Sequence, residues 1–161
     1  LGDLVSELLD LSRLEGGVLQ LKPEQFGVHD FLAEVTAGQP RIALEVHPVD
    51  LAVRADRSRL TQVVTNLVEN AVRHAPSGTD ITVSAVETRD GINLDVVDDG
   101  PGIAPAERNT VFDRFTRGGA TGGGTGLGLA IARWATELHG GTIEVLDRST
   151  GCHIRVSIPH S

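Results

Sequence analysis

The sequence predicts an α/β two-layer sandwich, in which a mixed, mostly antiparallel sheet is covered on one face by helices. Two long segments carry apolar residues at helical spacing, and several shorter ones alternate like strands. Helices and strands follow one another without the regular alternation of a parallel βαβ protein. A chain of 161 residues, 40% of them hydrophobic, is long enough for one such domain with a short appendage.

The appendage is residues 1–15, which we expect to form a helix separate from the domain at residues 16–161. Its leucines recur at spacings of three and four and give the stripe of a bundle or coiled-coil helix, which Gly16-Gly17 ends. Because no partner helix follows, we interpret it as a bundle helix cut from a longer protein. A helix docked on the domain is the alternative.

The next part of the domain is predicted to hold strands and one short helix. We expect strand-like segments around residues 18–26, a helix near 28–37, and β-rich pieces at 42–46 and 51–54. Asp56 then caps a long helix, whose buried stripe runs from Leu60 to Ala71 and which ends at Ala75-Pro76.

The second half of the domain begins with a predicted hairpin. Residues 81–86 and 92–97 alternate as strands around a turn at Asp90-Gly91, and the glycine-rich stretch 100–124 is typical of a functional loop. A second core helix starts at Leu127 and ends at Gly140-Gly141. Strands near residues 142–146 and 153–158 complete the sheet.

Composition narrows the class of partner. A net charge of -8 without a Lys/Arg block argues against nucleic acid or an anionic membrane surface. Cys152 is the only cysteine, which excludes an internal disulfide or a cysteine zinc cluster and fits a reducing compartment. No apolar run approaches the ~20 residues that span a bilayer. We therefore expect a cytoplasmic domain without membrane contact of its own.

The glycine run from Gly122 to Leu129 points to a phosphate chain. Glycines that lead into a helix present backbone N–H groups and the helix dipole to an anion. A Walker A loop is excluded because Lys22 is the only lysine, and the polar residues 115–119 do not form the buried strand that a dinucleotide fold requires. The run therefore belongs to another kind of nucleotide site.

Two further groups of polar residues could complete that site. Asn66 and Asn70 lie one turn apart on the long helix, and an amide oxygen is a suitable ligand for Mg²⁺, although a solvated polar face is the simpler interpretation. Asp98 closes a strand before Gly100 and Gly102, and its carboxylate could accept a hydrogen bond from an amine such as adenine N6. An ordinary Asp-Gly turn is the alternative.

Four ordered motifs resemble those of a known family. Residues 66–70, 98–102, 112–115 and 122–129 resemble the N, G1, F and G2 boxes of sensor histidine kinases, whose ATP-binding domain belongs to the superfamily of gyrase, Hsp90 and MutL. Residues 4–17 resemble the end of the second helix of the family's dimerisation domain. The resemblance implies the Bergerat-type ATP-binding fold, with ATP and Mg²⁺ as cofactors.

The resemblance also implies roles for single residues. Asn70 becomes the Mg²⁺ ligand, Asn66 a second contact to phosphate or metal, and Asp98 the adenine anchor. A lid from Ile103 to Gly124 is expected to order when ATP and Mg²⁺ bind. The other expected ATP-binding residues are Arg73, His74, Gly100, Gly102, Ile103, Arg114, Arg117, Gly122, Gly124, Thr125, Gly126, Leu127 and Gly128.

Position 66 bears on the reaction. ATP-hydrolysing relatives carry a glutamate four residues before the metal-binding asparagine, whereas this chain has Asn66. An amide cannot act as a general base, so the γ-phosphate is expected to be kept for an acceptor other than water. The family's acceptor histidine stands in a His-Glu-x-x-x-Pro motif that none of the six histidines matches, and His139 is interpreted as a helix-end cation.

Cys152 departs from the family's pattern. It stands where the family has threonine, and a thiol is a weaker donor, so a hydrogen bond from this position near the base pocket should be weaker. A packing role for Cys152 is equally compatible with the sequence.

The leading hypothesis is the catalytic domain of a two-component protein-histidine kinase. It would transfer the γ-phosphate to a histidine on its own phosphoacceptor and dimerisation domain, outside this chain, for relay to an aspartate of a response regulator. The resemblance implies a full-length homodimer anchored in the bacterial inner membrane. The alternatives are a nucleotide-sensing interaction domain without phosphotransfer and an anti-sigma-like serine kinase.

Overall fold

The computed structural model describes residues 20–108, 110–113 and 127–160. The predicted helix at residues 1–15, the division at residue 16 and most of the expected lid lie outside this part of the chain. The described elements are β1 (Glu24–Gly27), α2 (Val28–Val35), β2 (Ile42–His47), β3 (Ala52–Ala55), α3 (Arg57–His74), β4 (Ile81–Glu87), β5 (Gly91–Asp98), the 3₁₀ turn η1 (Pro105–Glu107), α4 (Gly128–Leu138), β6 (Thr142–Leu146) and β7 (Cys152–Pro159).

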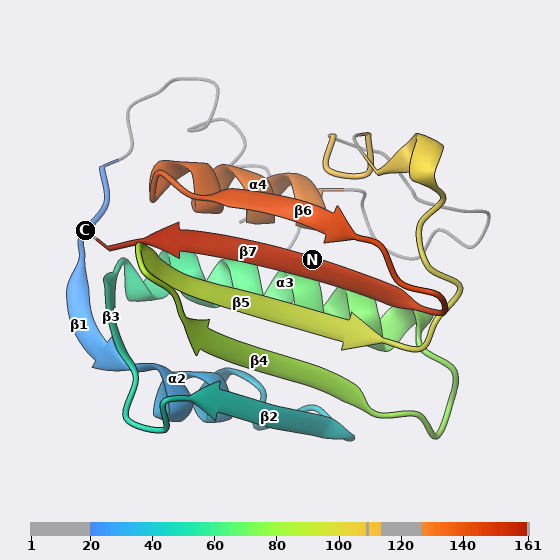
Figure 1. Cartoon of the computed structure of the whole chain (residues 1–161), viewed down its shortest axis with the longest axis horizontal. Coiled ribbons are helices and arrows are strands. Elements are labelled where there is room, and N and C mark those ends of the chain that lie inside the picture. The colour runs from blue at the N-terminus through green and yellow to red at the C-terminus, as the bar shows by residue number, and fades with distance from the viewer. Residues whose placement is uncertain (1–19, 109, 114–126, 161) are drawn as a thin grey trace.

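The main sheet has five strands in the order β2-β4-β5-β7-β6 (Figure 1). Strands β2 and β4 are parallel, and the other neighbouring pairs are antiparallel. Strands β1 and β3 form a separate antiparallel pair. The mixed, mostly antiparallel sheet confirms the predicted fold class, and β4 and β5 form the expected hairpin.

Helices α3 and α4 lie together on one face of the main sheet (Figure 1). Alternate residues of the central strands point into this layer, as Ile92, Leu94 and Val96 do from β5. The apolar stripe of α3 meets them, with Leu60 and Leu67 each 1% exposed. The core is therefore mostly aliphatic and lies between this sheet face and the helices, and Phe31 and Leu32 of α2 also belong to it.

Asp56 fixes the start of α3 and ties it to two distant segments. Its Oδ1 accepts a hydrogen bond from the backbone N–H of Arg59 at 3.1 Å, which confirms the predicted N-cap. Its Oδ2 accepts from the backbone N–H of Lys22 at 2.9 Å. Its own N–H donates to Nε2 of His139, just beyond α4, at 3.0 Å.

Two expectations are corrected by these contacts. His139 serves as a hydrogen-bond partner rather than as a helix-end cation: its Nε2 accepts from the backbone N–H of Asp56, and its Nδ1 lies 2.8 Å from the carbonyl oxygen of Ala135. Within the described residues the first strand is β1 from Glu24, and residues 20–23, which we expected in a strand-like segment, precede it without strand structure. The N–H of Lys22 is bound to Asp56, and Pro23 has no N–H to offer a neighbouring strand.

No helix in the described part of the chain combines the length and the apolar character needed to cross a membrane.

Candidate functional site

The C-terminal ends of α3 and β5 meet closely. A side-chain carbon on Gly100 would lie 2.7 Å from the carbonyl oxygen of His74, so only glycine lets the turn after β5 rest against the end of α3. A side-chain carbon on Gly128, at the start of α4, would lie 3.4 Å from Oδ1 of Asn66. The structure thus brings residues of three separate motifs into one region.

Asp98 is the charged group of this region. It is 3% exposed at the end of β5, and the backbone N–H of Gly100 donates to its Oδ1 at 2.7 Å. Burial raises the pKa of this carboxyl above its usual value, while the Gly100 hydrogen bond and the charges of His74 and Arg148 act in the opposite direction. Within the described residues no hydrogen bond reaches Oδ2, so this oxygen can accept one from a ligand.

The turn after Asp98 depends on glycine a second time. Gly102 has a φ of 77°, and a side-chain carbon there would lie 2.6 Å from the carbonyl oxygen of Gly151. Both the backbone conformation and the close approach require glycine. Ile103 follows and packs on the edge of the core, while Asp99 is exposed.

The polar face of α3 lies next to this turn. Asn66 and Asn70 are half-buried, and Nδ1 of His74 lies 2.8 Å from the backbone carbonyl oxygen of Asn70. Arg73 and Glu69 are exposed. The two amides can therefore offer oxygen ligands to a hard cation such as Mg²⁺.

The start of α4 supplies backbone donors. Leu127 is fully buried and precedes the helix, and the first turn has no side-chain cap and no acidic residue. Its N–H groups are thus suited to an anion placed beside Asn66. The predicted residues Arg114, Arg117, Gly122, Gly124, Thr125 and Gly126 lie outside the described part of the chain.

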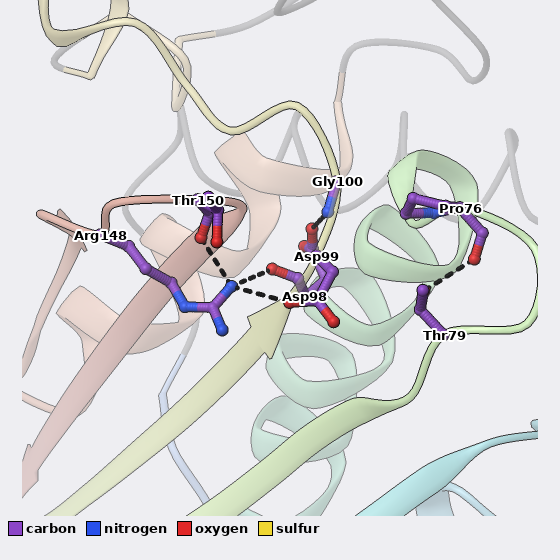
Figure 2. Close-up of polar contacts among 7 residues, drawn as sticks. All are labelled: Pro76, Thr79, Asp98, Asp99, Gly100, Arg148 and Thr150. Atoms are coloured by element: carbon purple, nitrogen blue, oxygen red, sulfur yellow. Dashed lines mark hydrogen bonds and ion pairs between the residues drawn. The ribbon is translucent and has the colours of Figure 1, made fainter.

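Sequence reasoning missed one residue of this region. Arg148, in the connection between β6 and β7, donates through Nη1 to the carbonyl oxygen of Asp98 at 2.7 Å and to that of Thr150 at 2.7 Å (Figure 2). The same nitrogen lies 3.1 Å from Oδ1 of Asp99. Residues 147–150 look like an ordinary polar turn, so no sequence pattern indicated this contact.

Cys152 lies beside Asp98. It pairs with Asp98 across the β5–β7 ladder and is 7% exposed among core residues. Burial, with the Asp98 charge second, raises the pKa of the thiol to about 12, so it is uncharged at neutral pH. The packing interpretation and the position beside the expected base pocket are both consistent with this placement.

The geometry corresponds to a known class of domain. Residues 55–161 match the family described as Histidine kinase-, DNA gyrase B-, and HSP90-like ATPase. Since the match covers well over half of the 161 residues, the chain belongs to this family. Within the family it is of the sensor histidine kinase type and corresponds to the ATP-binding catalytic domain, because its relatives include proteins named as sensor proteins and as histidine kinases.

Two curated relatives illustrate this. The chain is 34% identical over 165 residues to Sensor protein KdpD of Escherichia coli (strain K12), and this alignment covers 97% of the chain and 18% of the relative. It is 36% identical over 181 residues to Sensor protein SphS of Synechococcus elongatus, and this alignment covers 99% of the chain and 43% of the relative. The chain thus spans less than half of each relative's length.

Solved structures agree on the fold. The Acinetobacter baumannii histidine kinase AdeS superposes with a TM-score of 0.83 at 26% identity, covering 99% of this chain and 78% of that one. Full-length ShkA in complex with AMPPNP gives a TM-score of 0.83 at 28% identity, and the match covers 98% of this chain and 35% of the ShkA chain.

Proposed function

We propose that this chain binds Mg-ATP and delivers its γ-phosphate to a histidine that the chain does not contain. The observation that carries the proposal is Asp98: a carboxylate buried to 3% exposure that receives one backbone hydrogen bond and no cation on its oxygens among the described residues. A buried charge without a full set of partners is costly unless a ligand completes it. The complex of the relative ShkA with AMPPNP supports a nucleotide as that ligand.

The fit to a nucleotide can be followed residue by residue. Oδ2 of Asp98 would accept a hydrogen bond from the exocyclic amine of adenine, and Gly100 and Gly102 keep the turn free of side chains where a flat base would approach. His74 and Ile103 would border the base, Arg73 would reach the phosphates, and the first turn of α4, which begins at Gly128, would receive them together with Leu127.

We assign the metal to Asn70, with Asn66 as a second contact to phosphate or metal. When bound, Mg²⁺ neutralises phosphate charge and orients the γ-phosphate. An amide cannot deprotonate water, and Glu69 is exposed and turned away from Asn66. The chain's own residues therefore bind and orient the nucleotide without activating water, which favours transfer to an external acceptor over hydrolysis.

The acceptor and the other partners are proposals for the whole protein. We infer a phosphoacceptor and dimerisation domain whose last helix includes residues 1–15, a homodimer, and relay to an aspartate of a cognate response regulator. The relatives named as sensor proteins support this arrangement. We propose that residues 16–161 work in the cytoplasm of a protein anchored in the inner membrane, with no nucleic-acid partner.

The site is tested by binding of a fluorescent ATP analogue to the full chain. Asp98→Asn should weaken binding about 10- to 100-fold, since hydrogen bonds to charged groups contribute about 1.5–3 kcal/mol. Asn70→Ala should remove the dependence of binding on Mg²⁺. Unchanged binding in both variants would show that the site is wrongly assigned.

The reaction is tested by mixing the chain with a helical domain that carries the acceptor histidine and with radiolabelled ATP. Acid-labile phosphohistidine on that domain is the expected product. ATP binding without any labelled protein would favour a nucleotide-sensing domain, and acid-stable phosphoserine on a partner would indicate an anti-sigma-like serine kinase.

A further inference from the structure

We propose that Arg148 is a positioning residue for nucleotide recognition, which holds Asp98 and the turn after it in the orientation that receives the base. This inference rests on the proposed function and adds to it a residue outside the four sequence motifs. Arg148 belongs to the connection between β6 and β7, and it does not act through the Asp98 carboxylate but through the backbone beside it.

The contacts of Arg148 converge on a single nitrogen. Nη1 reaches the carbonyl oxygens of Asp98 and Thr150, both at 2.7 Å, and the carboxylate of Asp99 at 3.1 Å (Figure 2). A guanidinium nitrogen of this kind carries two N–H groups, so the three acceptors share them. The nitrogen therefore links the last residue of β5, the exposed residue after it and the β6–β7 connection.

The position of this link decides what it controls. Asp98 is the last residue of β5, and its side chain already bends back to accept from the N–H of Gly100 at 2.7 Å. Holding the Asp98 carbonyl on one side and the Gly100 N–H on the other leaves the carboxylate little freedom to rotate. Preorganisation of this kind strengthens binding by reducing what must be ordered when the ligand arrives.

The same connection makes further contacts near the turn after β5. Gly151 comes close to Gly102, whose turn follows Asp98, and Asp147 pairs with Arg108 just after η1. The β6–β7 connection thus supports the chain on both sides of the turn at residues 98–102. Arg148 is the member of this connection that contacts Asp98 through a side chain.

The test compares three variants of the full chain. Arg148→Ala should weaken binding of a fluorescent ATP analogue about tenfold, while Arg148→Lys, whose ammonium offers three donors, should recover most of the affinity. Arg155→Ala is the matched control: it also removes an arginine bound to an aspartate of β5, but this aspartate is Asp95, outside the turn at residues 98–102. Its affinity should stay within about twofold of the wild type.

Amide hydrogen exchange in the nucleotide-free chain tests whether Arg148 holds the turn, separately from whether the turn binds a nucleotide. In Arg148→Ala the N–H of Gly100 should exchange at least tenfold faster relative to the core amides of β5, and in Arg155→Ala this ratio should not change. An unchanged ratio in Arg148→Ala, or no recovery with lysine, overturns the inference. Faster exchange in a chain whose wild type binds no ATP overturns the proposed function and, with it, the link to nucleotide recognition.

Discussion

Asp95 and Asp98 lie three residues apart on β5, on opposite faces of the sheet, and differ in their partners. Asp95 faces away from the helices, and Arg155 engages both of its oxygens, at 2.8 and 3.0 Å. Asp98 faces the helix layer and receives one backbone hydrogen bond on its carboxylate. Both are buried, at 8% and 3% exposed. Pairing, not burial, therefore distinguishes a structural carboxylate from one available to a ligand.

The largest expected effect concerns the close packing at the Asp98 end. Gly100→Ala places a carbon 2.7 Å from the carbonyl oxygen of His74, where overpacking costs about 1–3 kcal/mol. Urea denaturation should show this loss, and binding of the ATP analogue should fall as well. Gly38→Ala is the control, because no atom lies within 4 Å of the added carbon. Equal stability of the two variants would contradict the tight contact between α3 and the turn.

The next effect concerns the paired aspartate. Asp95→Ala leaves Arg155 without its bidentate partner and should lower the free energy of unfolding by about 2 kcal/mol, between the values for exposed and buried pairs, since Arg155 is 34% exposed. ATP-analogue binding should be unchanged after correction for unfolded protein. Lost binding in a folded variant would mean that both faces of β5 serve the ligand.

A smaller effect follows from the raised pKa of Asp98. The folded chain then binds this proton more tightly than the unfolded chain, whose carboxyl keeps the value 3.8. The contribution of Asp98 to stability is therefore present at low pH and is lost as the pH rises through the folded-state pKa. Asp98→Asn should raise Tm at pH 7 by a few degrees and flatten the dependence of Tm on pH. A lower Tm in this variant would argue against an unpaired, ligand-binding carboxylate.

The smallest effect should be seen at Cys152, opposite Asp98 in the ladder. Since burial and the Asp98 charge raise the pKa of the thiol to about 12, iodoacetamide at pH 8 should alkylate the folded chain at least about 100-fold more slowly than the urea-unfolded chain. Mass spectrometry follows the modification. Rapid labelling of the folded chain would place Cys152 at the surface.

Much of the fold could be predicted because its signals are local. Asp56 defines the start of α3 because its side chain caps the helix through Arg59, three residues on. Asp90-Gly91 likewise indicates the turn between β4 and β5. The start of β1 and the role of His139 could not be predicted, since both depend on contacts with Asp56 from segments 34 and 83 residues away along the chain.

The candidate site divides in the same way. Asn66, Asn70, Asp98 and the glycines stand in ordered motifs that indicated a nucleotide site, and their roles remain predictions. Arg148 stands in no motif, because its partners are backbone carbonyls, which every residue carries. A contact of this kind leaves no pattern in the sequence.

The sequence by itself therefore determined the order of helices and strands, the four motifs and the kind of ligand to expect, because periodicity, capping and glycine turns act over a few residues. The tertiary structure decided which carboxylate of β5 is paired and which is open, and which arginine supports the turn beside it. Those outcomes depend on which side chains the β5–β7 ladder and the β6–β7 connection bring together. They also depend on the loss of water around the buried carboxylates.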